Sequence, residues 1–145
     1  MFFKKFLFLG ITTAVFASLG AVLYAKFYND TINDYSPILS YLSIAAACTF
    51  VAIFACIAFW ASTIVLKAWG EFVFNFLFAA GSMISILHPL TAQVEGDDFD
   101  YFMVYAIPLH FFPVLTWFAF KPLFFREKVG LHKATDTYGK GNAFR

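Results

Sequence analysis

Four long apolar stretches decide what this chain can fold into. They cover about 6–28, 37–66, 72–90 and 102–125, and only short connectors separate them. A helix needs roughly 20 apolar residues to span the hydrocarbon core of a bilayer, and all four are long enough. Hydrophobic residues make up 61% of the 145 residues and charged residues 13%, too few polar groups to cover a soluble domain. The sequence predicts an all-α integral membrane protein, an antiparallel four-transmembrane-helix bundle.

Positive charges lie almost entirely on one side of this predicted bundle. Of the ten Lys and Arg residues, only Lys26 falls on the side opposite the N-terminus. The positive-inside rule therefore predicts that the N-terminus and the C-terminus are both cytoplasmic, with 126–145 as a polar basic cytoplasmic tail. A cleavable signal peptide is an alternative for the first stretch, but its apolar length favours a retained helix. A net charge of +1 gives no case for nucleic-acid binding.

Small residues follow helical spacing on two of the stretches. Gly10, Ala14, Ala17, Ala21 and Ala25 share one face of the first helix, and a second stripe follows Ser36, Ser40, Ser43, Ala47 and Ala58. Small side chains let helix backbones approach closely in lipid. We expect these stripes to pack within the chain; the alternative is that one of them docks a partner subunit.

Polar residues at membrane depth are costly and mark places where function is expected. The third helix carries Glu71, Asn75, Ser82 and Ser85 along one side, which should face protein or water. We interpret Glu71 as a solvated cap at the helix N-terminus and the other three as interhelical hydrogen-bonding residues. A substrate path is the alternative.

Two histidines form the most suggestive pair. His88 is expected at the end of the third helix, and His110 about eight residues into the fourth, so both imidazoles are predicted in the outer half of the bundle. Facing histidines on two helices bind haem iron, hold a metal or relay a proton. Without motif spacing we favour structural hydrogen bonding, with His110 satisfying carbonyls freed by Pro113. The cofactor therefore stays unknown.

The connector before the fourth helix is acidic. It contains Glu95, Asp97, Asp98 and Asp100 around Gly96, and clustered carboxylates of this kind coordinate calcium. Because the spacing does not match the twelve-residue calcium loop, we favour a solvated turn. Asp97, Asp98 and Asp100 are the candidate metal ligands.

The fourth helix is interrupted by prolines. Ala106, His110, Pro113, Trp117 and Lys121 lie on roughly one face, and Pro108 and Pro113 are expected to bend the helix. Kinked helices line cavities in transporters. A small oligomeric transporter or channel is therefore one hypothesis, and it needs a homo-oligomer to build a pathway.

The motifs His88-Pro89-Leu90, 107–113 and Pro122-Leu123-Phe124-Phe125 give the chain a general resemblance to a group of small bacterial four-helix membrane proteins with no assigned function. The resemblance covers mostly the second half of the chain. It implies the same architecture and a bacterial inner membrane, and it implies no activity.

Three functional hypotheses follow. The leading one is a small polytopic membrane protein that is not an enzyme, either a standalone bundle or an accessory subunit of a membrane assembly, because the sequence has no nucleophile with a base, phosphate loop or metal motif. The second is a haem- or metal-binding redox protein that uses His88 and His110. The third is the transporter or channel. The expected partners are the lipid bilayer and a membrane-protein partner or second copy of the chain.

Overall fold

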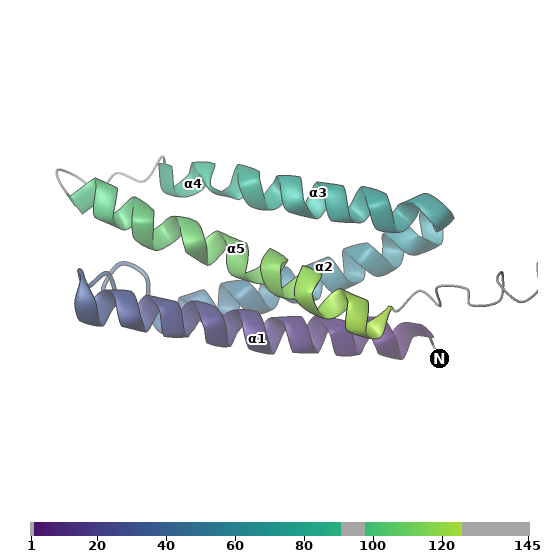
Figure 1. The fold of residues 1–145 in the computed structure, drawn as a ribbon, viewed down its shortest axis with the longest axis horizontal. Coiled ribbons are helices and arrows are strands. Elements are labelled where there is room, and N and C mark those ends of the chain that lie inside the picture. The colour runs from purple at the N-terminus through teal and green to yellow at the C-terminus, as the bar shows by residue number, and fades with distance from the viewer. Residues whose placement is uncertain (1, 91–97, 126–145) are drawn as a thin grey trace, which may run out of the picture.

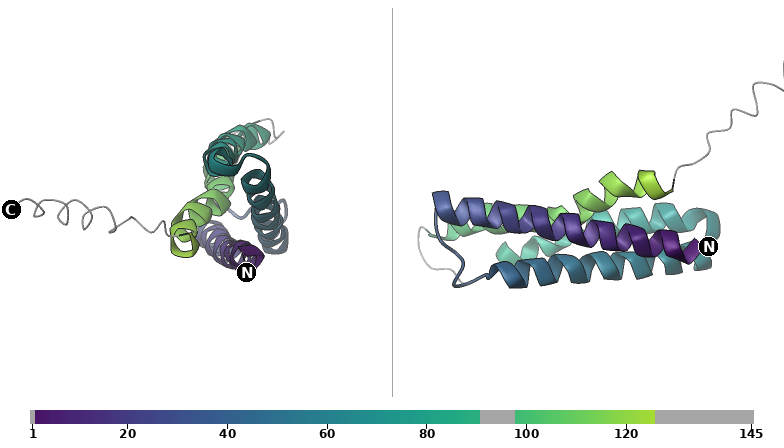
Figure 2. Two further views of the ribbon diagram at one scale, coloured as in Figure 1. Left: turned by 90° about the vertical axis from the view of Figure 1, so that its right-hand side faces the viewer. Right: turned by 90° about the horizontal axis from the view of Figure 1, so that it is seen from below.

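The chain is all-helical in the computed structural model, which describes residues 2–90 and 98–125, with side chains for 4–89 and 99–125. The elements in chain order are α1 (Phe2–Thr31), α2 (Tyr41–Val65), the short 3-10 helix η1 (Lys67–Trp69), α3 (Gly70–Ser85), α4 (Leu87–Leu90) and α5 (Asp98–Phe124). The long helices lie side by side and alternate in direction (Figures 1 and 2). We call the end that holds Phe2, η1 and Phe124 the terminal end, and the other the opposite end.

Four of the helical segments within the described chain are long and apolar enough to cross a membrane: Lys4–Thr31, Tyr41–Val65, Lys67–Pro89 and Phe99–Phe124. The hydropathy of the sequence therefore identified four long apolar helices correctly. Their bounds differ from the prediction at several points, and each difference has a local cause.

The second helix starts later than expected. It was predicted over 37–66, but α2 begins at Tyr41, because the Ser40 hydroxyl accepts the backbone N–H of Ser43 at 3.2 Å. A serine that accepts this bond satisfies an otherwise unpaired N–H in the first turn and marks the helix start. Pro37 lies in the preceding turn. The predicted start at 37 was four residues too early.

The third predicted helix is divided in two. Its backbone leaves the α-helical pattern at Ile86, between α3 and α4, and Pro89 lies within α4. Proline has no N–H to donate to the fourth residue before it, which here is Ser85, the last residue of α3. The fourth helix, predicted from Phe102, starts four residues earlier at Asp98.

The small-residue stripe on α1 packs inside the chain, as we expected. Ala17, Ala21 and Ala25 are fully buried. Nearer the terminal end, a Cβ added at Gly10 would lie 2.8 Å from the Cβ of Cys56, so α1 and α2 approach more closely there than two larger side chains allow. The Cys56 thiol also donates a hydrogen bond to the carbonyl of Phe6 at 3.0 Å.

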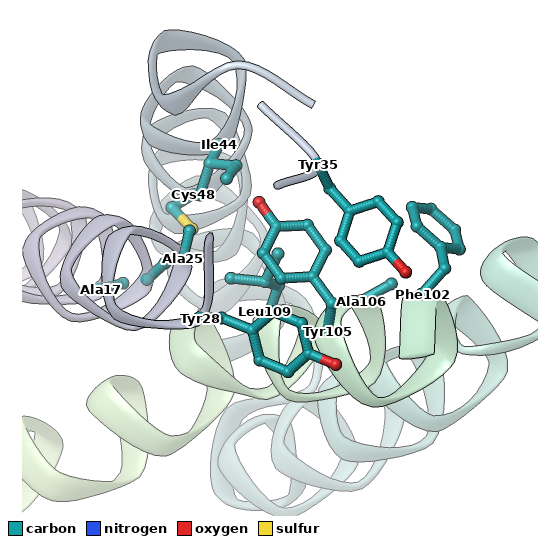
Figure 3. Packing of buried hydrophobic residues seen from close by; sticks show 11 residues of the cluster. Ala17, Ala25, Tyr28, Tyr35, Ile44, Cys48, Phe102, Tyr105, Ala106 and Leu109 are labelled. Carbon is teal, nitrogen blue, oxygen red and sulfur yellow. The ribbon is translucent and has the colours of Figure 1, made fainter. Parts of the chain in front are cut away.

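Two buried clusters hold the bundle together. At the opposite end the rings of Tyr28, Tyr35 and Tyr105 come together from α1, the α1–α2 connector and α5 (Figure 3), with centroids 5.2–6.3 Å apart. At the terminal end Trp117 packs against Phe59 and Phe74 at 5.4 and 5.3 Å. Aromatic pairs at this separation stabilise a fold beyond their area burial.

Candidate binding groove between α2, α3 and α5

A groove of about 870 Å³ runs along α2, α3, α4 and α5. It extends from Ser62 and Phe74, towards the terminal end, to Ile38 and His88 at the opposite end. Most of its lining is aliphatic or aromatic. Its volume falls within the range of roughly 300–1,000 Å³ that small-molecule sites occupy.

The groove opens sideways. Phe54 and Leu77 lie near the middle of α2 and α3 and line the groove, yet their exposed fractions are 64% and 61%. The second stripe of small residues borders the same space, since Ser43, Ala47 and Ala58 all line it. Of the four helices long enough to span a membrane, the one that contains α3 is the least covered by protein, with 11% of its most apolar window buried against 33–39% in the others.

His110 lies in the wall of the groove, half-buried, and its Nδ1 lies 2.9 Å from the carbonyl oxygen of Ala106. A carbonyl oxygen only accepts, so Nδ1 must carry the hydrogen. In the neutral imidazole the proton is then absent from Nε2, which becomes a hydrogen-bond acceptor and a metal-ligating atom. This bond is the structural role that we favoured, but the partner differs from the prediction. Pro113 has no N–H to donate to the carbonyl of Leu109, four residues earlier. His110 bonds the carbonyl of Ala106 and not that of Leu109.

The two histidines line one groove but lie at different depths. His88 is exposed in α4 at the opposite end, whereas His110 is close to the middle of α5. Glu71 and Lys121 form an ion pair across the antiparallel helices; His88 lies 17 residues from Glu71, and His110 lies 11 residues from Lys121. At 1.5 Å per residue, the two histidines therefore differ in position by about 9 Å along the bundle. His110 lies within one residue of the midpoint of α5, because the helix starts four residues earlier than expected. That both histidines lie in the outer half of the bundle stays a prediction.

Glu71 lies in the first turn of α3 and is partly solvated, and it also forms an ion pair. Its Oε1 lies 2.5 Å from Nζ of Lys121, and the Lys121 side chain is only 10% exposed while that of Glu71 is 56% exposed. The Lys121 ammonium also lies 5.5 Å from the centre of the Phe59 ring. The pair joins α3 to α5 at the terminal end of the groove. The sequence placed Lys121 on the relevant face but gave no signal that it is buried.

Asn75 and Trp117 lie one turn further along α3 and α5 from this ion pair. Asn75 Oδ1 and Trp117 Nε1 are both buried, and neither has a hydrogen-bond partner within the described part of the chain. One is an acceptor and the other a donor, so the two are chemically complementary. That Asn75 forms an interhelical hydrogen bond stays a prediction.

Ser82 and Ser85 both line the groove. The Ser85 hydroxyl donates to the carbonyl of Ser82 at 2.7 Å, a bond within its own helix. Ser82 lies eleven residues after Glu71 on α3, and His110 lies eleven residues before Lys121 on α5. Because the two helices are antiparallel and Glu71 pairs with Lys121, Ser82 and His110 lie at the same level along the bundle. The groove therefore has a polar level near its middle, formed by Ser82 on α3 and His110 on α5.

The acidic connector falls largely outside the described residues. Asp97 lies outside them, Asp98 is described only as the first residue of α5, and Asp100 is exposed. Over 2–90 and 98–125, no three His, Cys, Asp or Glu side chains come together in a way that holds a metal ion. The metal-ligand hypothesis for Asp97, Asp98 and Asp100 stays a prediction.

Comparison with known proteins adds no relative to this description. No protein-family model, curated protein or solved structure matches the chain. Inferences about function therefore depend on the groove and its residues.

Proposed function

We propose that this chain is a multi-pass membrane protein, not an enzyme, that binds a lipophilic molecule in the groove between α2, α3 and α5. Its four helices cross a bacterial inner membrane with both ends cytoplasmic. Support comes from four sufficiently long apolar helices and from the concentration of Lys and Arg on one side of the bundle.

The sideways-opening groove is the observation that carries this proposal. Sites for small molecules are concave and mostly apolar, with a few polar groups that orient the ligand. The groove has this composition, and His110 and Ser82 supply the polar groups. In a bilayer its open side, beside Phe54 and Leu77, faces acyl chains, so a lipophilic molecule enters without crossing water.

Filling the groove tests the proposal. A Cβ at Gly81 has no neighbour within 4 Å, so Gly81→Leu starts its side chain in open space and extends it into the groove. Ala79→Leu on the same helix is the matched control, since Ala79 is exposed and does not line the groove. After mild detergent extraction, native mass spectrometry should find a bound lipid on the wild type and on Ala79→Leu. Gly81→Leu should have lost it.

Equal lipid occupancy in all three proteins would refute binding in the groove. A stoichiometric protein that copurifies with the wild type and is lost in Gly81→Leu would instead make the groove the docking site of an accessory subunit. A second copy of the chain held in the same way would indicate a homo-oligomer.

The topology has its own test. Single cysteines placed in the 32–40 connector and in the 126–145 tail should react oppositely with a thiol reagent that does not cross the membrane. In intact cells the connector should be labelled and the tail protected. Labelling of the tail alone would invert the orientation, and labelling of both would contradict an even number of crossings.

A haem- or metal-binding protein is the second candidate, because the Ala106 carbonyl fixes the proton on Nδ1 of His110 and leaves Nε2 to ligate. An absorption spectrum with metal analysis of the purified protein decides this. A Soret band, or stoichiometric metal, that disappears in His110→Ala would support the second candidate over the first. The transporter hypothesis stays a prediction.

A further inference from the structure

We propose that the Ser82–His110 level of the groove recognises a hydroxyl group carried within the apolar part of the bound molecule. The ligand class is a lipid with a hydroxylated aliphatic chain. This inference rests on the proposed function, since it presupposes that the groove binds a lipid.

The first step is the chemistry of His110. Its Nδ1–H is committed to Ala106 at 2.9 Å, so the neutral ring offers the groove an acceptor nitrogen at Nε2. Burying an acceptor without a donor is costly in an apolar environment. A ligand that supplies a donor at this level removes that cost, whereas a plain hydrocarbon chain does not.

The second step is the position of Ser82. It lines the groove at the same level as His110, on the other helix. A serine hydroxyl both donates and accepts. A hydroxyl group of the ligand between the two helices donates to Nε2 of His110 and accepts from the hydroxyl of Ser82. A ketone or ether oxygen only accepts, and its lone pairs would face that of Nε2.

The third step is depth. His110 lies near the middle of α5, a helix of 27 residues. The headgroup of a membrane lipid lies at the water interface, close to the ends of such a helix. A polar group that reaches the Ser82–His110 level therefore belongs to the chain of the lipid, and a headgroup is excluded by position.

A competition experiment with matched probes tests the inference. The detergent-purified full chain receives equal amounts of three methyl esters of octadecanoic acid: one with a mid-chain hydroxyl, one with a mid-chain ketone and one unsubstituted. Native mass spectrometry separates the three complexes by mass. We expect the hydroxyl ester to bind about tenfold better than the unsubstituted one, the effect of one to two hydrogen bonds.

Variants assign the preference to the two residues. His110→Phe and, independently, Ser82→Ala should each bring the hydroxyl ester within about twofold of the unsubstituted ester while total binding persists. Thr63→Ala is the control, because Thr63 does not line the groove and its hydroxyl bonds the Trp60 carbonyl within α2, so the preference should stay unchanged. Using two variants keeps the test valid if one of them does not fold.

Each outcome has a distinct meaning. Equal binding of the hydroxyl and unsubstituted esters by the wild type would overturn this inference and leave the proposed function intact. A preference for the ketone would show that Nε2 donates, and would also overturn it. If none of the esters binds, both the inference and lipid binding in the groove fail.

Discussion

The hydroxyl of Tyr24 on α1 donates a hydrogen bond to the carbonyl oxygen of Val104 on α5, at 2.8 Å. In an uninterrupted helix this carbonyl accepts the N–H of the residue four positions later, but that residue is Pro108, which has none. The tyrosine thus replaces the missing backbone donor and joins α1 to α5 at the same point.

This relationship predicts a coupled pair of substitutions. Tyr24→Phe should lower the free energy of unfolding in mixed micelles by about 1–2 kcal/mol, because the Val104 carbonyl loses its partner. In a Pro108→Ala background the same substitution should cost clearly less, since the new N–H supplies the bond within α5. A double-mutant cycle measures the difference. Equal costs in the two backgrounds would show that the Tyr24 bond does not compensate for Pro108.

Two glycines of the same helix should respond oppositely to alanine. A Cβ at Gly70 would lie 2.2 Å from the backbone oxygen of Ser62, whereas a Cβ at Gly81 meets nothing within 4 Å. Gly70 has an ordinary helical φ of −57°, so the objection to a side chain there is steric. Gly70→Ala should destabilise by about 1–3 kcal/mol, and Gly81→Ala should stabilise by about 0.5–1 kcal/mol.

Thermal unfolding in detergent compares these two variants directly. Similar midpoints for Gly70→Ala and the wild type would mean that α2 and α3 separate near η1 more easily than their close contact implies.

The ion pair at the terminal end of the groove should be asymmetric. Lys121 is nearly buried and Glu71 is about half exposed. Glu71→Gln leaves an ammonium buried without its counter-charge and should destabilise by about 1–3 kcal/mol. Lys121→Met leaves a carboxylate that water reaches, so its cost should be smaller. Unfolding free energies of the two variants check this order. A larger cost for Lys121→Met than for Glu71→Gln would contradict the prediction that the unpaired ammonium of Lys121 is the more costly charge.

The connector between α1 and α2 predicts a response to acid. The hydroxyl and the backbone N–H of Ser36 hold the pKa of the Asp34 carboxyl below its ordinary value of 3.8. A carboxyl group whose pKa is lower in the folded state than in the unfolded state stabilises the fold at pH values above its unfolded-state pKa. This stability is lost as the pH falls through its folded-state pKa. Asp34→Asn keeps an acceptor oxygen but does not titrate.

The wild type should therefore lose stability relative to Asp34→Asn only as the pH drops below about 4. Unfolding midpoints of both proteins between neutral and strongly acidic pH give the comparison. A difference that already changes near neutral pH would assign the effect to another group.

The spans and the α1 packing face could be predicted because both depend on local composition and on helical spacing. Ala17, Ala21 and Ala25 form a face of small side chains at helical spacing, and such a face favours close packing of a neighbouring helix. The ends of the helices were harder to predict from the sequence. The start of α2 depends on the Ser40–Ser43 bond, and the break at Ile86 depends on the N–H that Pro89 cannot donate.

The groove could not be predicted, because it depends on how far α3 diverges from α2. No residue in α3 encodes that divergence by itself. His110 lies closer to the middle of α5 than predicted, because the helix begins four residues earlier than expected. Pro108 did signal an unpaired carbonyl at Val104, but nothing local identified Tyr24, eighty positions away, as its donor.

The sideways opening of the groove at Phe54 and Leu77 has a consequence for how occupancy is set. A molecule that enters through the hydrocarbon is already partitioned out of water, so its aqueous solubility drops out of the equilibrium. Its mole fraction among the surrounding lipids is the quantity that competes for the site. A dissociation constant expressed per litre of buffer would therefore depend on the amount of membrane added. The fraction of occupied protein would depend only on the composition of the bilayer.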